Sequence, residues 1–147
     1  LEIPNARIDL MDISDISINN TNINIMSLKP KSISHILHNN ILTTDPEFSY
    51  DIIISNPPYI SLQDVDNLEH SVKYYDPLNA LSDSEDGLCF YARIYELSHF
   101  MLNDGGTIIL EFGTHQQAED IINIFKEFKY IIHNDMNNNP RAIEFQK

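Results

Sequence analysis

The sequence has 147 residues, of which 42% are hydrophobic and 10% aromatic, so it is large enough to bury the core of one globular domain. A single cysteine, Cys89, excludes an internal disulfide, and no apolar run is long enough to cross a bilayer, so we expect a reducing, cytoplasmic location and no membrane. The formal net charge of −13, from 22 acidic against 9 basic residues, opposes binding to phosphate backbones; we expect a protein or small-molecule substrate rather than direct binding to nucleic acid.

The first third of the chain predicts two short strands on either side of a helix. Residues 7–11 favour a strand that ends in Asp12. Residues 15–28 have helical potential, although their asparagines are weak helix formers. Pro30 breaks this helix, and residues 35–38 favour the second strand.

The middle of the chain contains the most apolar of the predicted strands. Residues 51–55 read Asp-Ile-Ile-Ile-Ser, a continuous β-branched run that is typical of a strand buried on both faces of a parallel sheet. A Pro-Pro pair ends the run, because proline cannot donate to a sheet. A polar segment follows at residues 61–85, and Asp86 is a candidate N-cap for a helix from residue 87 to about residue 102.

The last third predicts the end of this helix and four further elements. The Asp-Gly-Gly sequence at residues 104–106 is expected to end the helix, with glycine supplying a left-handed cap. The elements that follow are a strand, a helix and two strands joined by a turn, at residues 107–112, 116–128, 130–133 and 142–145. This alternation predicts an α/β fold with a mostly parallel sheet and a C-terminal antiparallel hairpin.

The tetrapeptide Asn56-Pro57-Pro58-Tyr59 lies where a chemical site is expected, at the carboxyl end of the most apolar strand. The Asn56 side-chain carbonyl and the Pro57 backbone carbonyl, directed by two rigid rings, are two acceptors for a planar NH₂ group. Tyr59 offers a flat face to a conjugated group. The loop therefore suits methylation of a glutamine side chain or of an adenine or cytosine amino group. The alternative interpretation is a turn that merely ends the strand and packs its tyrosine.

Beyond this loop the sequence resembles the HemK-type glutamine N5-methyltransferases, which modify peptide chain release factors. The resemblance runs from about Asp12 to the end of the chain. The matching residues are Ser55-Asn56-Pro57-Pro58-Tyr59-Ile60, Tyr75-Asp76-Pro77, Ala80-Leu81, Glu85-Asp86-Gly87-Leu88, Tyr91, Gly105-Gly106, Leu110-Glu111-Phe112-Gly113, Asp135 and Arg141.

The resemblance implies a Rossmann-like methyltransferase fold, S-adenosylmethionine as methyl donor and a release factor as protein substrate. It implies that Asp12 binds the ribose hydroxyls, although the residue taken alone fits a helix N-cap equally well. Asn40 and Ile41 match positions beside the adenine, where family members often carry an acid and an aromatic residue. Asn56 would face both the donor methyl and the substrate amide, with Pro57, Pro58 and Tyr59 completing the catalytic loop.

The sequence departs from the family at its beginning. The first strand of the fold and its glycine-rich loop are absent, and the four glycines form no Gly-x-Gly motif. Residues 1–4 are not those of a signal peptide, and the chain does not begin with methionine. We expect residues 1–147 to be a partial methyltransferase domain, from the second strand to the C-terminus, with an exposed apolar sheet edge. Two rivals remain: a nucleic-acid amino-group (N6-adenine type) methyltransferase, and an inactive truncated remnant of the family.

The other reactive side chains carry weaker expectations. The six histidines are scattered, and no metal site is expected. Cys89 fits packing better than nucleophilic chemistry, and Glu85 and Asp86 fit helix capping. Glu111, at the end of a predicted strand, fits either a structural or a functional role.

Overall fold

The structure is a computed structural model that describes residues 6–147, with Ser71 described by its backbone alone. Residues 1–4, in which no signal peptide is expected, lie outside the described part. The chain divides into two compact units, residues 1–45 and residues 46–147, and each is described here by itself. Among the described residues, no helix is both long and apolar enough to cross a bilayer.

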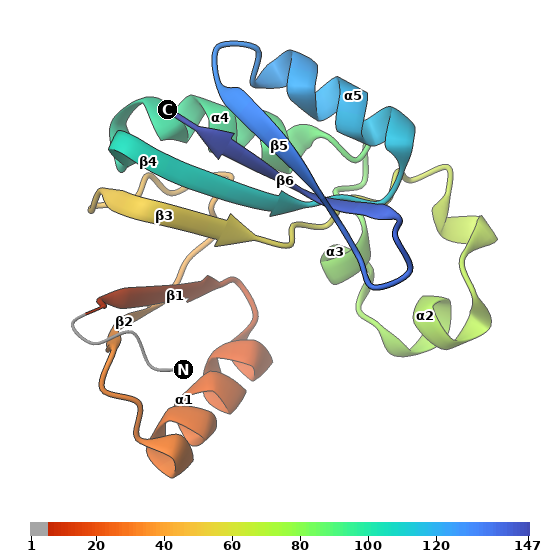
Figure 1. The fold of residues 1–147 in the computed structure, drawn as a ribbon. Helices are drawn as coiled ribbons and strands as arrows, with labels where there is room; N and C mark the ends of the chain where they lie inside the picture. Colours follow the sequence, from red (N-terminus) through yellow and green to blue (C-terminus); the bar gives the residue numbers. More distant parts are fainter. Residues whose placement is uncertain (1–5) are drawn as a thin grey trace. The chain divides into compact units, whose positions relative to one another are not determined.

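The first unit is a β-α-β element (Figure 1). Strand β1 (Ile8–Asp12) and strand β2 (Ile33–His38) pair in parallel, and helix α1 (Asp15–Leu28) connects them. The sequence prediction of all three elements is confirmed, with β2 beginning two residues earlier than expected. Ser14 caps α1, because its side-chain oxygen accepts a hydrogen bond from the Ser17 amide. None of the residues of α1 is fully buried, which fits its asparagine-rich composition.

The second unit contains a mixed four-stranded sheet in the order β3-β4-β6-β5 (Figure 1). Strands β3 and β4 are parallel, and β6 is antiparallel to both β4 and β5. The strands are β3 (Tyr50–Ser55), β4 (Leu102–Glu111), β5 (Lys129–Asn134) and β6 (Pro140–Gln146). The helices are η1 (Val65–Asn67), α2 (His70–Tyr75), α3 (Leu78–Leu81), α4 (Cys89–Met101) and α5 (His115–Ile124). The predicted α/β class and the C-terminal antiparallel hairpin are confirmed.

The apolar core of the second unit joins the sheet to α4 and α5. Alternate residues of β4 and β6, which point to one face of the sheet, are fully buried, as are the inner residues of the two helices. These are Ile108, Leu110, Ile143 and Phe145 in the strands and Tyr91, Ile94, Leu97, Ala118 and Ile121 in the helices. Phe125 stacks on Phe145 with ring centroids 4.3 Å apart. Burial of each large apolar side chain contributes about 1.5–3 kcal/mol, so this core fixes α5 and β4 against each other.

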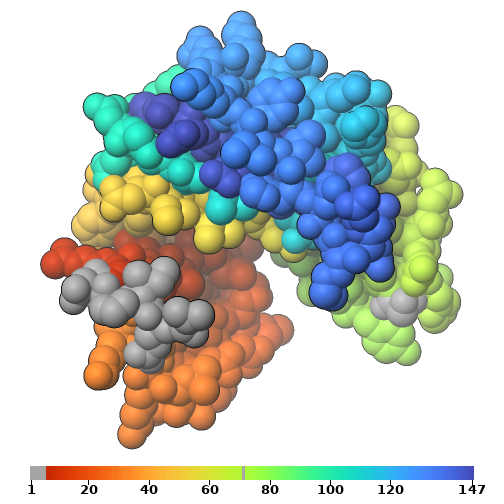
Figure 2. Space-filling view, viewed as in Figure 1, coloured from red at the N-terminus to blue at the C-terminus, as the bar shows by residue number. Residues whose placement is uncertain are grey.

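Strand β3 is less buried than its sequence predicts. Ile52 is 59% and Ile54 is 73% exposed, and the atoms of β3, in yellow, reach the surface in Figure 2. In its sheet β3 pairs with β4 alone, so it is an edge strand. Of the three isoleucines of β3, only Ile53, opposite the buried Ile108, points to the face that α4 and α5 cover. The expectation of burial on both faces was wrong, whereas the expected exposed apolar edge is present.

The beginning of α4 is not capped by Asp86 as predicted. The helix starts at Cys89, and its N-cap, Leu88, has no side-chain hydrogen bond. Asp83 supplies the acceptors instead, with Oδ1 bonded to the Gly87 amide at 3.0 Å and Oδ2 to the Cys89 amide at 3.1 Å. Among the described residues, Asp86 accepts a hydrogen bond only from the Leu88 amide. The positive φ of Gly87 turns the chain here, so that the carboxylate of Asp83 faces the N-terminus of α4.

The end of α4 also differs from the prediction. Residue 102 follows the helix directly in extended conformation and begins β4. Leu102 is only 3% exposed, and its burial draws the chain into the sheet before the glycines are reached. Gly105 has a φ of 75°, but it lies inside β4, where the register with β3 shifts. It therefore permits an irregularity of the strand rather than a helix cap.

Candidate active site

The loop Asn56–Tyr59 leaves the sheet at the carboxyl end of β3, as the sequence predicts. Asn56 is exposed, Pro57 is buried, and Pro58 and Tyr59 are half-buried. The segment that carries α2 and α3 lies beyond the same end of the sheet (Figure 1). It is joined to the loop by a hydrogen bond from the Ile60 amide to the Leu81 carbonyl, at 2.9 Å, and by a β-bridge between Ile60 and Ser82. The loop thus presents an exposed amide side chain from a backbone that is held in place.

The ring of Tyr59 packs against the backbone at Gly113. A Cβ atom at Gly113 would stand 2.9 Å from Cε2 of the ring, so the contact requires glycine. The Tyr59 hydroxyl lies 3.5 Å from Oε1 of Glu111, at the long limit of a hydrogen bond. The backbone carbonyl of Glu111 makes a second contact, in which it accepts a hydrogen bond from the Tyr91 hydroxyl at 2.7 Å. Glu111 therefore has a structural role through its backbone and a side chain that faces Tyr59.

Electrostatics keep the Tyr59 hydroxyl protonated. Burial raises its pKa above the ordinary value for tyrosine, and the negative charge of Glu111 raises it further, while Arg141 acts in the opposite direction. Burial also raises the pKa of Tyr91. Both phenols are hence neutral donors around neutral pH, and neither is placed to act as a base.

Gln117 is a residue of this site that the sequence prediction missed. Its Nε2 donates to the carbonyl of Tyr59 at 2.9 Å and to that of Gly87 at 3.0 Å, while its Oε1 accepts from the Gly113 amide at 2.9 Å. The available signal was the pattern Thr-x-x-Gln at the start of α5, which is typical of a capping box. Thr114 does cap the helix, but the glutamine side chain is directed to the loop instead.

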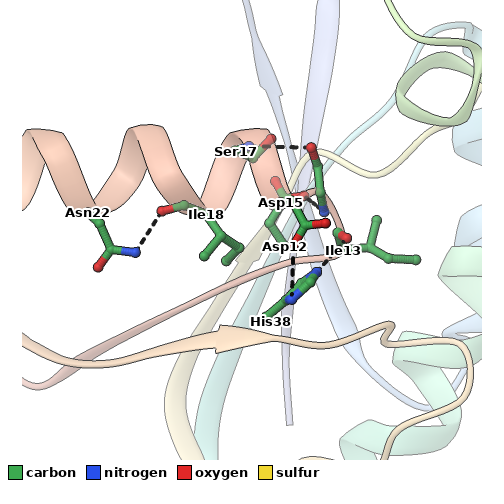
Figure 3. A network of polar contacts seen from close by, with 8 residues as sticks. Asp12, Ile13, Asp15, Ser17, Ile18, Asn22 and His38 are labelled. Atoms are coloured by element: carbon green, nitrogen blue, oxygen red, sulfur yellow. Dashed lines mark hydrogen bonds and ion pairs between the residues drawn. The ribbon is translucent and has the colours of Figure 1, made fainter.

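Asp12 ends β1 in the first unit and is exposed. Its Oδ1 accepts from the Ser14 amide at 2.8 Å, and its own carbonyl accepts from the Asn39 amide at 3.2 Å. Figure 3 shows the surrounding network, in which Nε2 of His38 lies 2.8 Å from the Ile13 carbonyl. The N-cap of α1 is Ser14, so Asp12 is not that cap. Its carboxylate instead stabilises the turn between β1 and α1.

Asn40 and Ile41 follow β2, at the same end of the two-stranded sheet as Asp12, and both are half-buried. The Asn40 side-chain oxygen accepts from the Leu42 amide at 2.9 Å, and its carbonyl accepts from the Thr44 amide at 2.8 Å. Asn40 therefore shapes its own turn. The first unit brings Asp12, Asn40 and Ile41 to one end of its strands, and the second unit gathers the Asn56–Tyr59 loop with Glu111 and Gln117.

The remaining candidates for chemistry are not arranged for it. Burial, together with the negative charge of Asp83, raises the pKa of Cys89 to about 12, so its thiol is protonated near neutral pH and is a poor nucleophile. Across residues 6–147, no group of three or more His, Cys, Asp or Glu side chains could hold a metal ion.

Comparison with known proteins shows which proteins the chain is similar to. The family described as "Methyltransferase small domain" matches residues 1–72. Release factor glutamine methyltransferases of Fusobacterium nucleatum and Clostridium botulinum are 34% and 35% identical to the chain over 99% and 97% of its length. A bifunctional methyltransferase of Rickettsia bellii is 35% identical over 98% of the chain. Over nearly its whole length the chain is therefore similar to curated methyltransferases.

The chain covers only part of these methyltransferases, spanning 42% of the Fusobacterium, 52% of the Clostridium and 26% of the Rickettsia protein. Solved structures agree on the methyltransferase fold. A methyltransferase from Pyrococcus furiosus superposes with a TM-score of 0.68 at 16% identity, over 97% of this chain and 64% of that one. A putative methyltransferase from Streptococcus mutans, solved in complex with SAH, gives a TM-score of 0.54 at 15% identity, over 96% and 76% of the two chains.

Proposed function

We propose that this chain is part of an enzyme that transfers a methyl group from S-adenosylmethionine to the side-chain amide nitrogen of a glutamine in a peptide chain release factor. The support comes from the names of the relatives, which cover the chain almost completely, and from the loop at the end of β3. Because the relatives are about twice as long as the chain or longer, the activity is proposed for the whole enzyme to which these residues contribute.

The observation that carries the proposal is the contrast within the Asn56–Tyr59 loop. Asn56 is exposed, whereas Pro57 is buried and Tyr59 is held through its carbonyl and its ring. The Asn56 side-chain oxygen and the Pro57 carbonyl can each accept one N–H of a primary amide, while Tyr59 lies against the planar group. Acceptors fixed before the reaction cost no reorganisation when charge develops on the nitrogen.

The proposed transfer is a single displacement. A new bond forms between the amide nitrogen and the methyl carbon while the bond from that carbon to the donor sulfur breaks, and the electrons of the broken bond stay on sulfur. The nitrogen becomes more positive during the transfer, and the two acceptor oxygens stabilise that charge. Its extra proton then leaves to solvent, so no strong base is required beside the nitrogen.

The chain carries residues that fit the adenosine half of the donor. The exposed carboxylate of Asp12 can accept from two ribose hydroxyls, and Asn40 with Ile41 offers a half-buried surface for the adenine. S-adenosylmethionine supplies the electrophilic methyl group when bound. The chain has no Gly-x-Gly motif to approach the methionine half, so its own residues account for only part of the donor site.

The charge of the chain favours a protein acceptor over nucleic acid. Its net charge is −13, and the acidic side chain of Glu111 lies 3.5 Å from the hydroxyl of Tyr59 in the loop. A polyanionic acceptor would be repelled, whereas a peptide that carries basic residues would be attracted. Glutamine is therefore preferred here over an adenine or cytosine amino group.

Donor binding is tested by calorimetric titration of S-adenosylmethionine into the folded chain. Asp12→Asn should weaken binding at least about tenfold, since hydrogen bonds to a charged acceptor contribute about 1.5–3 kcal/mol. Asp15→Asn is the matched control, because it removes the same charge from an aspartate that is 92% exposed only three residues away. Equal affinities of the two variants would exclude Asp12 from the donor site.

Methyl transfer is tested with labelled S-adenosylmethionine and peptides that contain the release factor glutamine. Label should enter the glutamine peptide, should not enter a peptide with asparagine in its place, and should be lost in Asn56→Ala. Incorporation into an oligonucleotide instead would support the nucleic-acid rival. A folded protein that binds the donor but labels neither acceptor would contradict the proposed function.

A further inference from the structure

The side-chain amide of Gln117 connects three segments that are distant in sequence. Its partners Tyr59, Gly87 and Gly113 lie 58, 30 and 4 positions away, and the three heavy-atom distances are between 2.9 and 3.0 Å. Both N–H donors and the carbonyl oxygen of the amide are used. No residue type other than asparagine or glutamine can donate twice and accept once from one planar group, and asparagine is one carbon shorter.

Close packing shows that the protein is shaped around this contact. Gly87 has a φ of 84°, and a Cβ atom there would stand 2.4 Å from the Tyr59 carbonyl oxygen and 3.1 Å from Nε2 of Gln117. Any side chain at position 87 would therefore clash with the Tyr59 carbonyl and crowd the Gln117 amide. The three partners of Gln117 can meet only because two of them are glycines.

Gln117 is not needed to cap its own helix. The N–H that caps the start of α5 is the backbone amide of Gln117, which donates to the side-chain oxygen of Thr114 at 3.1 Å. Any residue except proline at position 117 would make that bond. The side chain is thus available for a different role, which its bond to Tyr59 indicates.

The hydrogen bond from Gln117 to the Tyr59 carbonyl restrains the loop close to Asn56. Pro57 and Pro58 have φ fixed by their rings, so few torsions separate Asn56 from the carbonyl that Gln117 holds. The next residue, Ile60, is held by the Leu81 carbonyl. A shift of the Tyr59 peptide would therefore rotate the Pro57 carbonyl and move Asn56.

We propose that Gln117 is a positioning residue for methyl transfer, whose amide holds the Tyr59 peptide so that Asn56 and the Pro57 carbonyl point at the acceptor nitrogen. This inference rests on the proposed function of the loop. Gln117 does not touch the reacting atoms; it acts through Tyr59.

Two variants distinguish the role of the Gln117 side-chain oxygen from that of its nitrogen. Gln117→Glu keeps an oxygen for the Gly113 amide but faces the Tyr59 and Gly87 carbonyls with oxygen instead of N–H. Gln117→Ala removes both halves. Gln116→Ala is the matched control on the same helix, because its side chain is exposed and only reaches Asp120 at 3.5 Å.

The first readout is amide hydrogen exchange by NMR on the folded chain and does not require activity. The Ile60 amide should exchange about tenfold faster in both Gln117 variants and unchanged in the control, because a lost hydrogen bond to the loop lowers its local stability. The Gly113 amide should lose protection in Gln117→Ala and keep it in Gln117→Glu. Unchanged exchange at Ile60 in both variants would overturn the inference.

The second readout is steady-state methyl transfer. In Gln117→Glu, kcat should fall at least about tenfold while KM for S-adenosylmethionine stays the same, since Gln117 acts on the acceptor side of the site. An unchanged kcat in an active enzyme would overturn the inference even if exchange at Ile60 is faster. If the wild type transfers no methyl group, the proposed function fails, and exchange at Ile60 alone then decides whether Gln117 holds the loop.

Discussion

Tyr59 and Gly113 are in direct contact although 54 positions separate them in the chain. The Tyr59 ring lies where a side chain at Gly113 would have to be, with Cε2 and Cδ2 only 2.9 and 3.1 Å from the position of a Cβ atom. Because Gly113 follows β4 and Tyr59 follows β3, and these strands are parallel neighbours, their carboxyl ends bring the two residues together. This contact places the tyrosine of the candidate loop.

Gly113→Ala should displace Tyr59 and lower the free energy of unfolding by about 1–3 kcal/mol, the usual cost of overpacking. Gly105→Ala is an informative comparison, because nothing lies within 4 Å of its added Cβ and its cost arises from the positive φ alone. Chemical denaturation measures both variants. The NMR signal of Ile60 should shift in Gly113→Ala only; a shift of similar size in Gly105→Ala would argue against a local effect on the loop.

Ile54→Thr should slow aggregation without a loss of stability. Ile54 is 73% exposed on an edge strand, so its replacement removes apolar surface at an open sheet edge and changes the free energy of unfolding by less than about 0.5 kcal/mol. Ile108→Thr, at a fully buried position of β4, should cost about 2–4 kcal/mol. Light scattering and urea unfolding test the pair, and a large loss of stability in Ile54→Thr would show that this side chain is covered.

Asp83 should make the stability of the second unit fall at acid pH. Burial acts to raise the pKa of its carboxyl, but hydrogen bonds from the Glu85, Cys89 and Gly87 amides outweigh it and lower the pKa. A carboxyl whose pKa is lower in the folded state contributes stability above its unfolded pKa of about 3.9, and this contribution is lost as pH falls through the folded pKa. Thermal unfolding between about pH 6 and pH 2 measures it.

Asp83→Asn should remove that part of the pH dependence and lower stability at neutral pH by roughly 1–2 kcal/mol, because one amide oxygen cannot replace two carboxylate oxygens. Asp86→Asn is the matched control, since in the described part of the chain Asp86 accepts a hydrogen bond only from the Leu88 amide. If both variants had the same acid profile as the wild type, the hydrogen bonds to Asp83 would not be the cause.

Cys89 should react slowly with thiol reagents while the chain is folded. Its pKa is raised to about 12, so at pH 8 the reactive thiolate is rare, whereas an unperturbed cysteine has a pKa of about 8.5. Alkylation at pH 8 should be at least about tenfold faster in denaturant than in buffer. Similar rates in the two conditions would show that the thiol is neither buried nor influenced by Asp83.

The sequence alone was sufficient for the strands and for helices α1, α4 and α5, but not for the short helices η1, α2 and α3. The β-branched run before Asn56 predicts β3, the alternation of strands and helices predicts the α/β fold, and the turn-rich Asn137–Pro140 predicts the final hairpin. Each of these predictions depends on periodicity or on the rigid backbone of proline, and both signals come from residues that are close together in the sequence.

Only the tertiary structure decided how the loop is held and which residues end the helices. Asp83 rather than Asp86 meets the start of α4, and Gly105 distorts a strand instead of capping a helix. Gln117 holds Tyr59 from 58 positions away. A hydrogen-bonding side chain is satisfied by whichever partner folding brings within about 3 Å, and burial of the core around α4, α5 and β4 determines that partner.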